Sequence, residues 1–264
     1  MPDSLTDFSK STFTHEGKQR DVYRTGSGPA VIVISEMPGI TPAVADFARK
    51  VAAQGLTAVM PHVFGDPGRE MSAGYVAQSI FPACVSREFT AFATGKTSPI
   101  TVWLRALAKQ AHEECGGPGV GAVGMCFTGG FALAMMVDDV VVAPVLSQPS
   151  LPFPLSKKHK RDVGISDADL ERVKERVSAG ACVIGLRFTG DRTSPGERFA
   201  RLREELGDGF IGVEIDSSKG NRYGHPASAH SVLTNHLIDE PGQPTRDALD
   251  QVLAFFRERL LSTG

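Results

Sequence analysis

The most constraining feature of the sequence is the stretch from Val120 to Gly130, which reads VGAVGMCFTGG. Its first half is small and apolar, as in a buried strand, and residues 131–137 after it are strong helix formers. Between them lies G-x-C-x-x-G-G, a relaxed form of the strand–turn–helix pattern G-x-S-x-G, with cysteine for serine and Thr128 inserted before Gly129. The stretch therefore predicts a strand that turns sharply into a helix, with Cys126 at the turn.

Two interpretations of Cys126 are open. In the first, the turn presents the sulfur, and the N–H groups of the following helix favour its thiolate form, as in a nucleophile. In the second, Cys126 is a buried structural residue, because free cysteine is among the most buried residue types. The overlapping run 119–124 also matches the dinucleotide-binding pattern G-x-G-x-x-G. Its glycines lie inside the predicted strand rather than after it, which excludes a dinucleotide site.

The composition is that of an ordinary globular protein, with 41% hydrophobic and 22% charged residues among 264. A net charge of −2 gives no indication that the protein binds nucleic acid or an anionic membrane. We find neither a signal peptide nor an apolar run long enough for a membrane helix. The four cysteines form no C-x-x-C pair, so we expect no metal site and a reducing cytoplasm. These features are compatible with a homodimer.

Buried strands alternate with amphipathic helices along the chain, which predicts an α/β fold with a mostly parallel central sheet and helices on both faces. We expect one domain, residues 1–264, that begins with a hairpin at 15–24. Glycine and proline interrupt the pattern near 63–98 and 147–165, where we expect lid-like insertions. Besides the strand that starts at Val120, strands are expected at 30–34, 56–60, 140–142, 181–188 and 210–215, and helices at 43–54, 99–115, 166–180, 194–206 and 245–261.

A nucleophilic cysteine needs a nearby base and a third group that orients the base. After a strand–turn–helix nucleophile, the acid and then the histidine follow along the chain. Asp191 comes shortly after the strand at 181–188, and His225 lies in the loop after the strand at 210–215. We expect His230 in a helix after that loop, so His225 is the predicted base. Plainer interpretations are a turn residue for Asp191 and a surface histidine for His225.

The end of the strand at 30–34 supplies further candidates. An oxyanion hole is predicted from the backbone N–H of Phe127, next to the nucleophile, and that of Met37 in the loop after this strand. Glu36 lies beside it. Its carboxylate could contact the thiol of Cys126 or form a salt bridge across the loop.

These motifs together resemble the dienelactone hydrolase family, cysteine hydrolases with the α/β-hydrolase fold. The resemblance runs from about Ala30 to the C-terminus and rests on SEMPG at 35–39, GMCFTGG at 124–130, Gly190–Asp191 and Gly224–His225. It implies hydrolysis of a small ester or lactone through an acyl-enzyme, without metal or organic cofactor. The roles it implies are Cys126 as nucleophile, His225 as base, Asp191 as the acid that orients it, and Glu36 as the carboxylate that contacts the resting thiol.

The sequence also departs from the family. Its namesake enzymes bind a substrate carboxylate with arginines, one of them a few residues after the catalytic histidine. Residues 226–231 contain no arginine. The resemblance therefore implies ester, lactone or thioester hydrolysis without specifying dienelactone, and the available arginines are Arg87, Arg105, Arg192 and Arg222.

Two rival functions use the same fold. A reactive, exposed Cys126 would also suit a redox-sensing or carrier thiol. A noncatalytic binding module could keep the scaffold without turnover, because fold does not imply function. The combination of Cys126, Asp191 and a following histidine favours the hydrolase.

Overall fold

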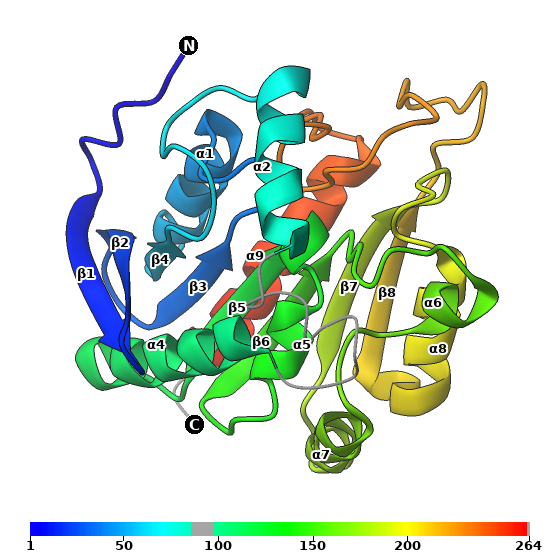
Figure 1. Ribbon diagram of the computed structural model, residues 1–264. Helices are drawn as coiled ribbons and strands as arrows, with labels where there is room; N and C mark the ends of the chain where they lie inside the picture. The colour runs from blue at the N-terminus through cyan, green and yellow to red at the C-terminus, as the bar shows by residue number, and fades with distance from the viewer. Residues whose placement is uncertain (86–97, 263–264) are drawn as a thin grey trace.

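The computed structural model describes residues 1–85 and 98–262 (Figure 1). Its centre is an eight-stranded sheet with the order β1-β2-β4-β3-β5-β6-β7-β8, in which only the β1–β2 and β2–β4 pairs are antiparallel. The mostly parallel sheet predicted from the sequence is thus confirmed. The strands are β1 (Ser9–His15), β2 (Lys18–Gly26), β3 (Ala30–Ile34), β4 (Thr57–Pro61), β5 (Val120–Met125), β6 (Val141–Ser147), β7 (Val183–Phe188) and β8 (Phe210–Ile215).

Helices cover both faces of this sheet (Figure 1). Several begin where the sequence offers a capping side chain: the Ser166 hydroxyl accepts a hydrogen bond from the Asp169 N–H at 3.1 Å. Within the described residues, none of the helices combines the length and apolar character needed to cross a membrane. The helices are α1 (Pro42–Ala52), α2 (Ala73–Val85), α4 (Pro99–Cys115), α5 (Phe131–Met135), α6 (Lys157–Arg161), α7 (Asp167–Ser178), α8 (Gly196–Leu206) and α9 (Pro244–Leu261).

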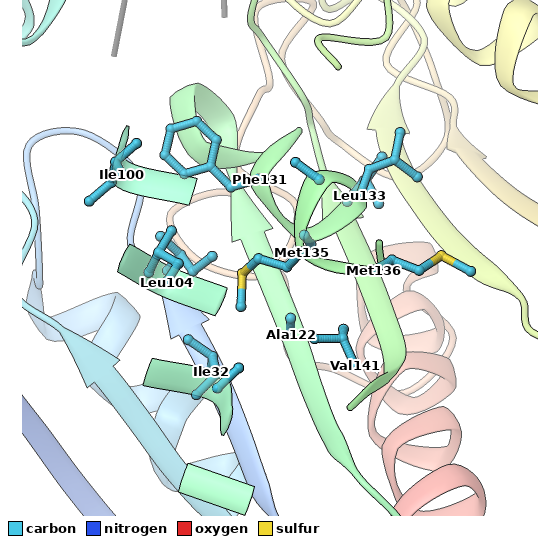
Figure 2. Close-up of a cluster of buried hydrophobic side chains, with 14 of the residues drawn as sticks. Ile32, Ile100, Leu104, Ala122, Phe131, Leu133, Met135, Met136 and Val141 are labelled. Carbon is cyan, nitrogen blue, oxygen red and sulfur yellow. The ribbon is translucent and has the colours of Figure 1, made fainter. Parts of the chain in front are cut away.

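The alternation of side chains along β3 divides the core into two layers. Val31 and Val33 pack with α1 and α9 on one face, whereas Ile32 and Ile34 pack with α4 and α5 on the other. Figure 2 shows the second layer, where Phe131 and Met135 of α5 meet Ile100 and Leu104 of α4. The short helix after Cys126 is therefore anchored by apolar burial.

Most predicted elements lie where the sequence placed them. β3 and β8 have the predicted bounds, and α4 spans 99–115 as expected. The strand predicted at 140–142 was too short, because β6 continues through apolar residues to Ser147. In the first predicted insertion, near 63–98, the structure contains α2, and residues 86–97 lie outside the described chain. That the two insertions act as lids stays a prediction.

The parallel strands β3, β5, β6, β7 and β8 all end at one edge of the sheet. The residues that follow them, near 36, 126, 148, 191 and 216, are therefore brought together although they are far apart in the sequence. In open α/β sheets this edge is where ligands bind.

The second predicted insertion, 147–165, is fastened to the core by Arg198 of α8. This side chain is 1% exposed, and its guanidinium donates to the carbonyls of Pro149, Pro152, His159 and Asp162, the last at 2.6 Å. Burial lowers the pKa of Arg198 to about 10, which still leaves it charged at neutral pH. The buried guanidinium of Arg198 thus supplies the hydrogen-bond donors for backbone carbonyl groups in a segment with little regular structure.

We expect Arg198→Met to lower the free energy of unfolding by about 3 kcal/mol, because buried carbonyl oxygens lose their donor. The matched control is Arg201→Met on the same helix, where the side chain is 39% exposed and pairs with Glu205. The control should change stability by about 0.5 kcal/mol or less. Urea denaturation of both variants measures the difference, and equal losses would contradict the role given to Arg198.

Candidate active site

Cys126 lies at a strained turn directly after β5. Its φ of +55° falls in the left-handed region, which residues with a side chain rarely adopt. The turn continues as η2 (Cys126–Thr128) before α5 begins. Glycine is required on both sides: a Cβ on Gly124 would lie 2.1 Å from the Thr128 carbonyl oxygen, and one on Gly129 would lie 2.5 Å from the Cα of Pro149. The strand–turn–helix geometry predicted for this stretch is present.

Thr128, which interrupts the simpler sequence pattern, holds the turn together. Its buried hydroxyl accepts a hydrogen bond from the Met125 N–H at 2.9 Å. The same hydroxyl lies 3.0 Å from the Ile34 carbonyl oxygen, to which it can donate. Thr128 thus links the ends of β5 and β3, the two strands that carry Cys126 and Glu36.

Asp191, in the loop after β7, holds the histidine of the site. Its Oδ2 lies 2.6 Å from Nδ1 of His230, and its Oδ1 accepts from the N–H and hydroxyl of Thr193 at 2.9 and 2.7 Å. Burial alone would raise the pKa of Asp191, but the hydrogen bonds from His230 and Thr193 outweigh it and lower this pKa. Asp191 is therefore an anion at neutral pH.

His230 joins Asp191 to Cys126. Besides its contact with Asp191 through Nδ1, His230 interacts with the side chain of Cys126. Burial disfavours the imidazolium, but the hydrogen bonds and negative charges of Asp191 and Cys126 prevail and raise the pKa of His230 to about 11. The described residues thus form a continuous chain Cys126–His230–Asp191.

The sequence predicted that His225 would occupy this position, and the structure puts His230 there instead. His225 is buried against Phe188, with ring centroids 5.0 Å apart, and its backbone is held by the Asn221 side chain. Its buried Nε2 has no hydrogen-bond partner in the described chain, and burial lowers its pKa. The helix expected around His230 is also absent, because residues 226–236 consist of turns and irregular backbone.

Glu36 has different partners from those the sequence suggested. Its carboxylate is 2% exposed and accepts hydrogen bonds from the side chains of Gln148, Ser231, Thr234 and Asn235. These are its hydrogen bonds within the described residues, so neither the thiol contact nor the salt bridge expected for Glu36 is present there. The carboxylate instead ties the end of β3 to the loop that carries His230.

Cys126 lines a cavity of about 710 Å³. Glu36, Asp191 and His230 also line it, and Met37, Phe127 and Phe153 provide apolar surface. Phe127 stacks edge-to-face between Phe64 and Phe153, at centroid distances of 5.7 and 6.4 Å. Met37 and Phe127 therefore lie where the predicted oxyanion donors should be, although the use of their N–H groups stays a prediction.

The arginines considered for substrate binding differ in position. Arg192 lines the cavity and is exposed. Arg105 pairs with Asp138 at 2.5 Å, and Arg222 contacts the hydroxyl of its neighbour Tyr223 at 2.5 Å. Arg87 lies outside the described residues. Nor do the described His, Cys, Asp and Glu side chains form a group of three or more that could hold a metal ion.

The turn at Cys126 gives a direct test of Thr128. We expect Thr128→Val to lower the free energy of unfolding by about 1–3 kcal/mol, because the buried Met125 N–H loses its acceptor. Thr128→Ser keeps the hydroxyl and should retain most of that stability. The comparison is made by urea denaturation, and a Ser variant as unstable as the Val variant would show that the methyl group, not the hydroxyl, matters.

Comparisons with known proteins agree with the fold described above. The model of the dienelactone hydrolase family matches residues 21–259. The fold is similar to that of a candidate dienelactone hydrolase from Klebsiella pneumoniae, with 17% identity, a TM-score of 0.64, and 95% of this chain and 98% of that chain covered. It is also similar to a dienelactone hydrolase from Anabaena variabilis, with 13% identity, a TM-score of 0.61, and coverage of 96% and 99%.

A third similar structure is P91, a dienelactone hydrolase-like promiscuous phosphotriesterase from metagenomic libraries, with 15% identity, a TM-score of 0.61, and coverage of 96% and 98%. None of the curated proteins compared with the chain matches it. The family match extends over nearly the whole sequence, from β2 to α9. The chain therefore belongs to the dienelactone hydrolase family, and it is a hydrolase of the ester- and lactone-cleaving class.

Proposed function

We propose that the protein hydrolyses a small carboxylic ester or lactone through an acyl-enzyme on Cys126, with His230 as proton carrier and Asp191 as the residue that orients it. The observation that carries the proposal is that Cys126, His230 and Asp191 line one cavity, where His230 contacts Asp191 through Nδ1 and interacts with Cys126. A nucleophile, a base and a carboxylate that orients the base are the elements of a catalytic triad.

In the first half of the reaction, the sulfur of Cys126 attacks the ester carbonyl, and a C–S bond forms as the C–O bond breaks. The raised pKa of His230 means that its imidazole holds a proton at neutral pH. That proton passes to the departing alkoxide, which leaves as an alcohol. In a lactone the alcohol stays attached to the acyl group.

In the second half, water attacks the thioester. Acylation has removed the negative charge of the sulfur, which is one of the causes of the raised pKa of His230. The pKa therefore falls when the acyl-enzyme forms, and the imidazole can accept a proton from water. The C–S bond breaks, the carboxylic acid leaves, and the proton on His230 restores the starting state.

The oxyanion formed in each half needs donors that are already in place. We assign this role to the backbone N–H groups of Met37 and Phe127, because both residues line the cavity beside Cys126. A reducing cytoplasm fits this chemistry, since Cys115, Cys126 and Cys182 are free thiols and the nucleophile must stay reduced.

The first test separates the two histidines. We expect His230→Asn to reduce kcat/KM for p-nitrophenyl acetate by about a thousandfold or more, because the proton carrier is lost. His225→Asn, the same change in the same loop, should reduce it by about threefold or less, provided that circular dichroism shows a folded protein. A larger loss of kcat/KM in His225→Asn than in His230→Asn would show that His225 is the proton carrier.

The second test concerns Cys126 itself. The wild type should release p-nitrophenol over many turnovers, whereas Cys126→Ala should show no more than about a thousandth of that rate. Mass spectrometry of the quenched wild-type reaction should find an acyl group on Cys126. A single burst of product followed by a stable acyl-enzyme would instead favour a carrier thiol. Peroxide sensitivity without any ester turnover would favour a redox sensor.

A further inference from the structure

A second histidine of the same loop, His236, also lines the cavity and has no role in the triad. Its Nδ1 faces the main chain and accepts hydrogen bonds from the N–H groups of His230 at 3.3 Å and Ser231 at 3.1 Å. A ring nitrogen that accepts carries no proton. In the neutral imidazole the proton is therefore on Nε2, which makes Nε2 a donor.

Charge and surroundings keep this ring neutral. His236 is half-buried and packs edge-to-face on Phe188, with centroids 6.2 Å apart. Burial and the nearby charge of His230 lower the pKa of His236, although Glu36 and Asp191 oppose this. At neutral pH the residue thus presents an uncharged N–H rather than a cation.

Among the residues that the structure describes, the Nε2 atom of His236 has no hydrogen-bond partner, and it is accessible. The hydrogen bonds of the His236 ring within the described chain are those of Nδ1. Nε2 is also absent from the buried polar atoms that lack a partner among these residues. Since the ring forms part of the cavity wall, its free donor is available to a bound molecule.

The rest of the cavity decides what this donor can bind. The acidic groups on its wall are already engaged, Glu36 with neutral side chains and Asp191 with His230 and Thr193. The wall formed by Met37, Phe127 and Phe153 is apolar. The exposed cation Arg192 also lines the cavity, but the donor of His236 is uncharged. A neutral oxygen on an otherwise apolar acyl chain matches this donor and the apolar wall. An all-carbon chain at the same place would leave the N–H unsatisfied, which weakens binding by about tenfold.

We propose that His236 determines specificity by donating its Nε2–H to a neutral carbonyl oxygen in the acyl chain, so that the substrate is an ester or lactone of a keto acid. This inference rests on the proposed hydrolase function, because it names the substrate class of the same cavity. It differs from recognition of a carboxylate by arginine, since the group recognised is uncharged.

The test compares p-nitrophenyl hexanoate with its 3-oxo, 4-oxo and 5-oxo derivatives. For each protein the ratio of kcat/KM between each oxo ester and hexanoate is measured, so that a general loss of activity cancels. His236→Asn keeps an acceptor near the position of Nδ1 and lacks the donor at Nε2. We expect it to lower the ratio for at least one oxo ester by about tenfold relative to the wild type.

Two further variants control for changes in the loop. His225→Asn makes the same substitution in the same loop, at a residue that does not line the cavity, and should leave every ratio at the wild-type value. His236→Gln keeps an amide N–H near the position of Nε2 and should retain part of the preference. If His236→Asn leaves every ratio unchanged, or reduces all esters equally, the proposal is overturned.

A binding experiment separates this proposal from the function on which it rests. Cys126→Ala protein is titrated calorimetrically with ethyl hexanoate and with the ethyl oxohexanoates, a measurement that needs no turnover. Tighter binding of an oxo ester, lost when His236→Asn is added, supports the donor role even if the wild type hydrolyses none of the esters. Hydrolysis without any such difference in affinity or rate overturns the role of His236 and leaves the hydrolase intact.

Discussion

The arrangement of the site depends on one buried carboxylate, that of Glu36. A buried charge is costly unless hydrogen bonds satisfy it, and here Gln148, Ser231, Thr234 and Asn235 supply them. Three of these donors belong to the loop that follows His230, so the loop folds correctly only when it satisfies the charge. Because residues 226–236 have neither helix nor strand to shape them, these bonds take the place of secondary structure, and they set where His230 and His236 lie.

The position of Cys126, the proposed nucleophile, depends on a different constraint, the turn after β5. A residue with positive φ costs of the order of 1–3 kcal/mol unless its surroundings fix it. Around Cys126 this is done by the hydroxyl of Thr128, by close backbone contact at Gly124 and by the burial of α5 against α4. The strained residue is thus supported by local bonds, whereas its histidine partner is positioned by contacts between distant segments.

That difference explains what the sequence could predict. The mostly parallel sheet, the bounds of β3 and α4, and the positions of Cys126 and Asp191 at strand ends follow from local patterns of apolar residues, glycine and proline. The histidine could not be chosen in this way, because the loop after β8 contains His225, His230 and His236. The choice depends on Phe188 and Asn221, which hold His225 away, and on Asp191, which holds His230. No local sequence pattern distinguishes the three histidines from one another.

The separation of Glu36 from the sulfur also bears on the resting state. A carboxylate in contact with the sulfur would repel a thiolate and favour the protonated thiol. Here Glu36 is occupied by the loop, and Cys126 interacts with His230, whose raised pKa keeps the imidazole charged at neutral pH. The positive imidazole therefore lies against negative Asp191 and also interacts with Cys126. In the proposed reaction the proton already lies on His230 at rest, and Glu36 acts through the loop that carries this residue rather than through the sulfur.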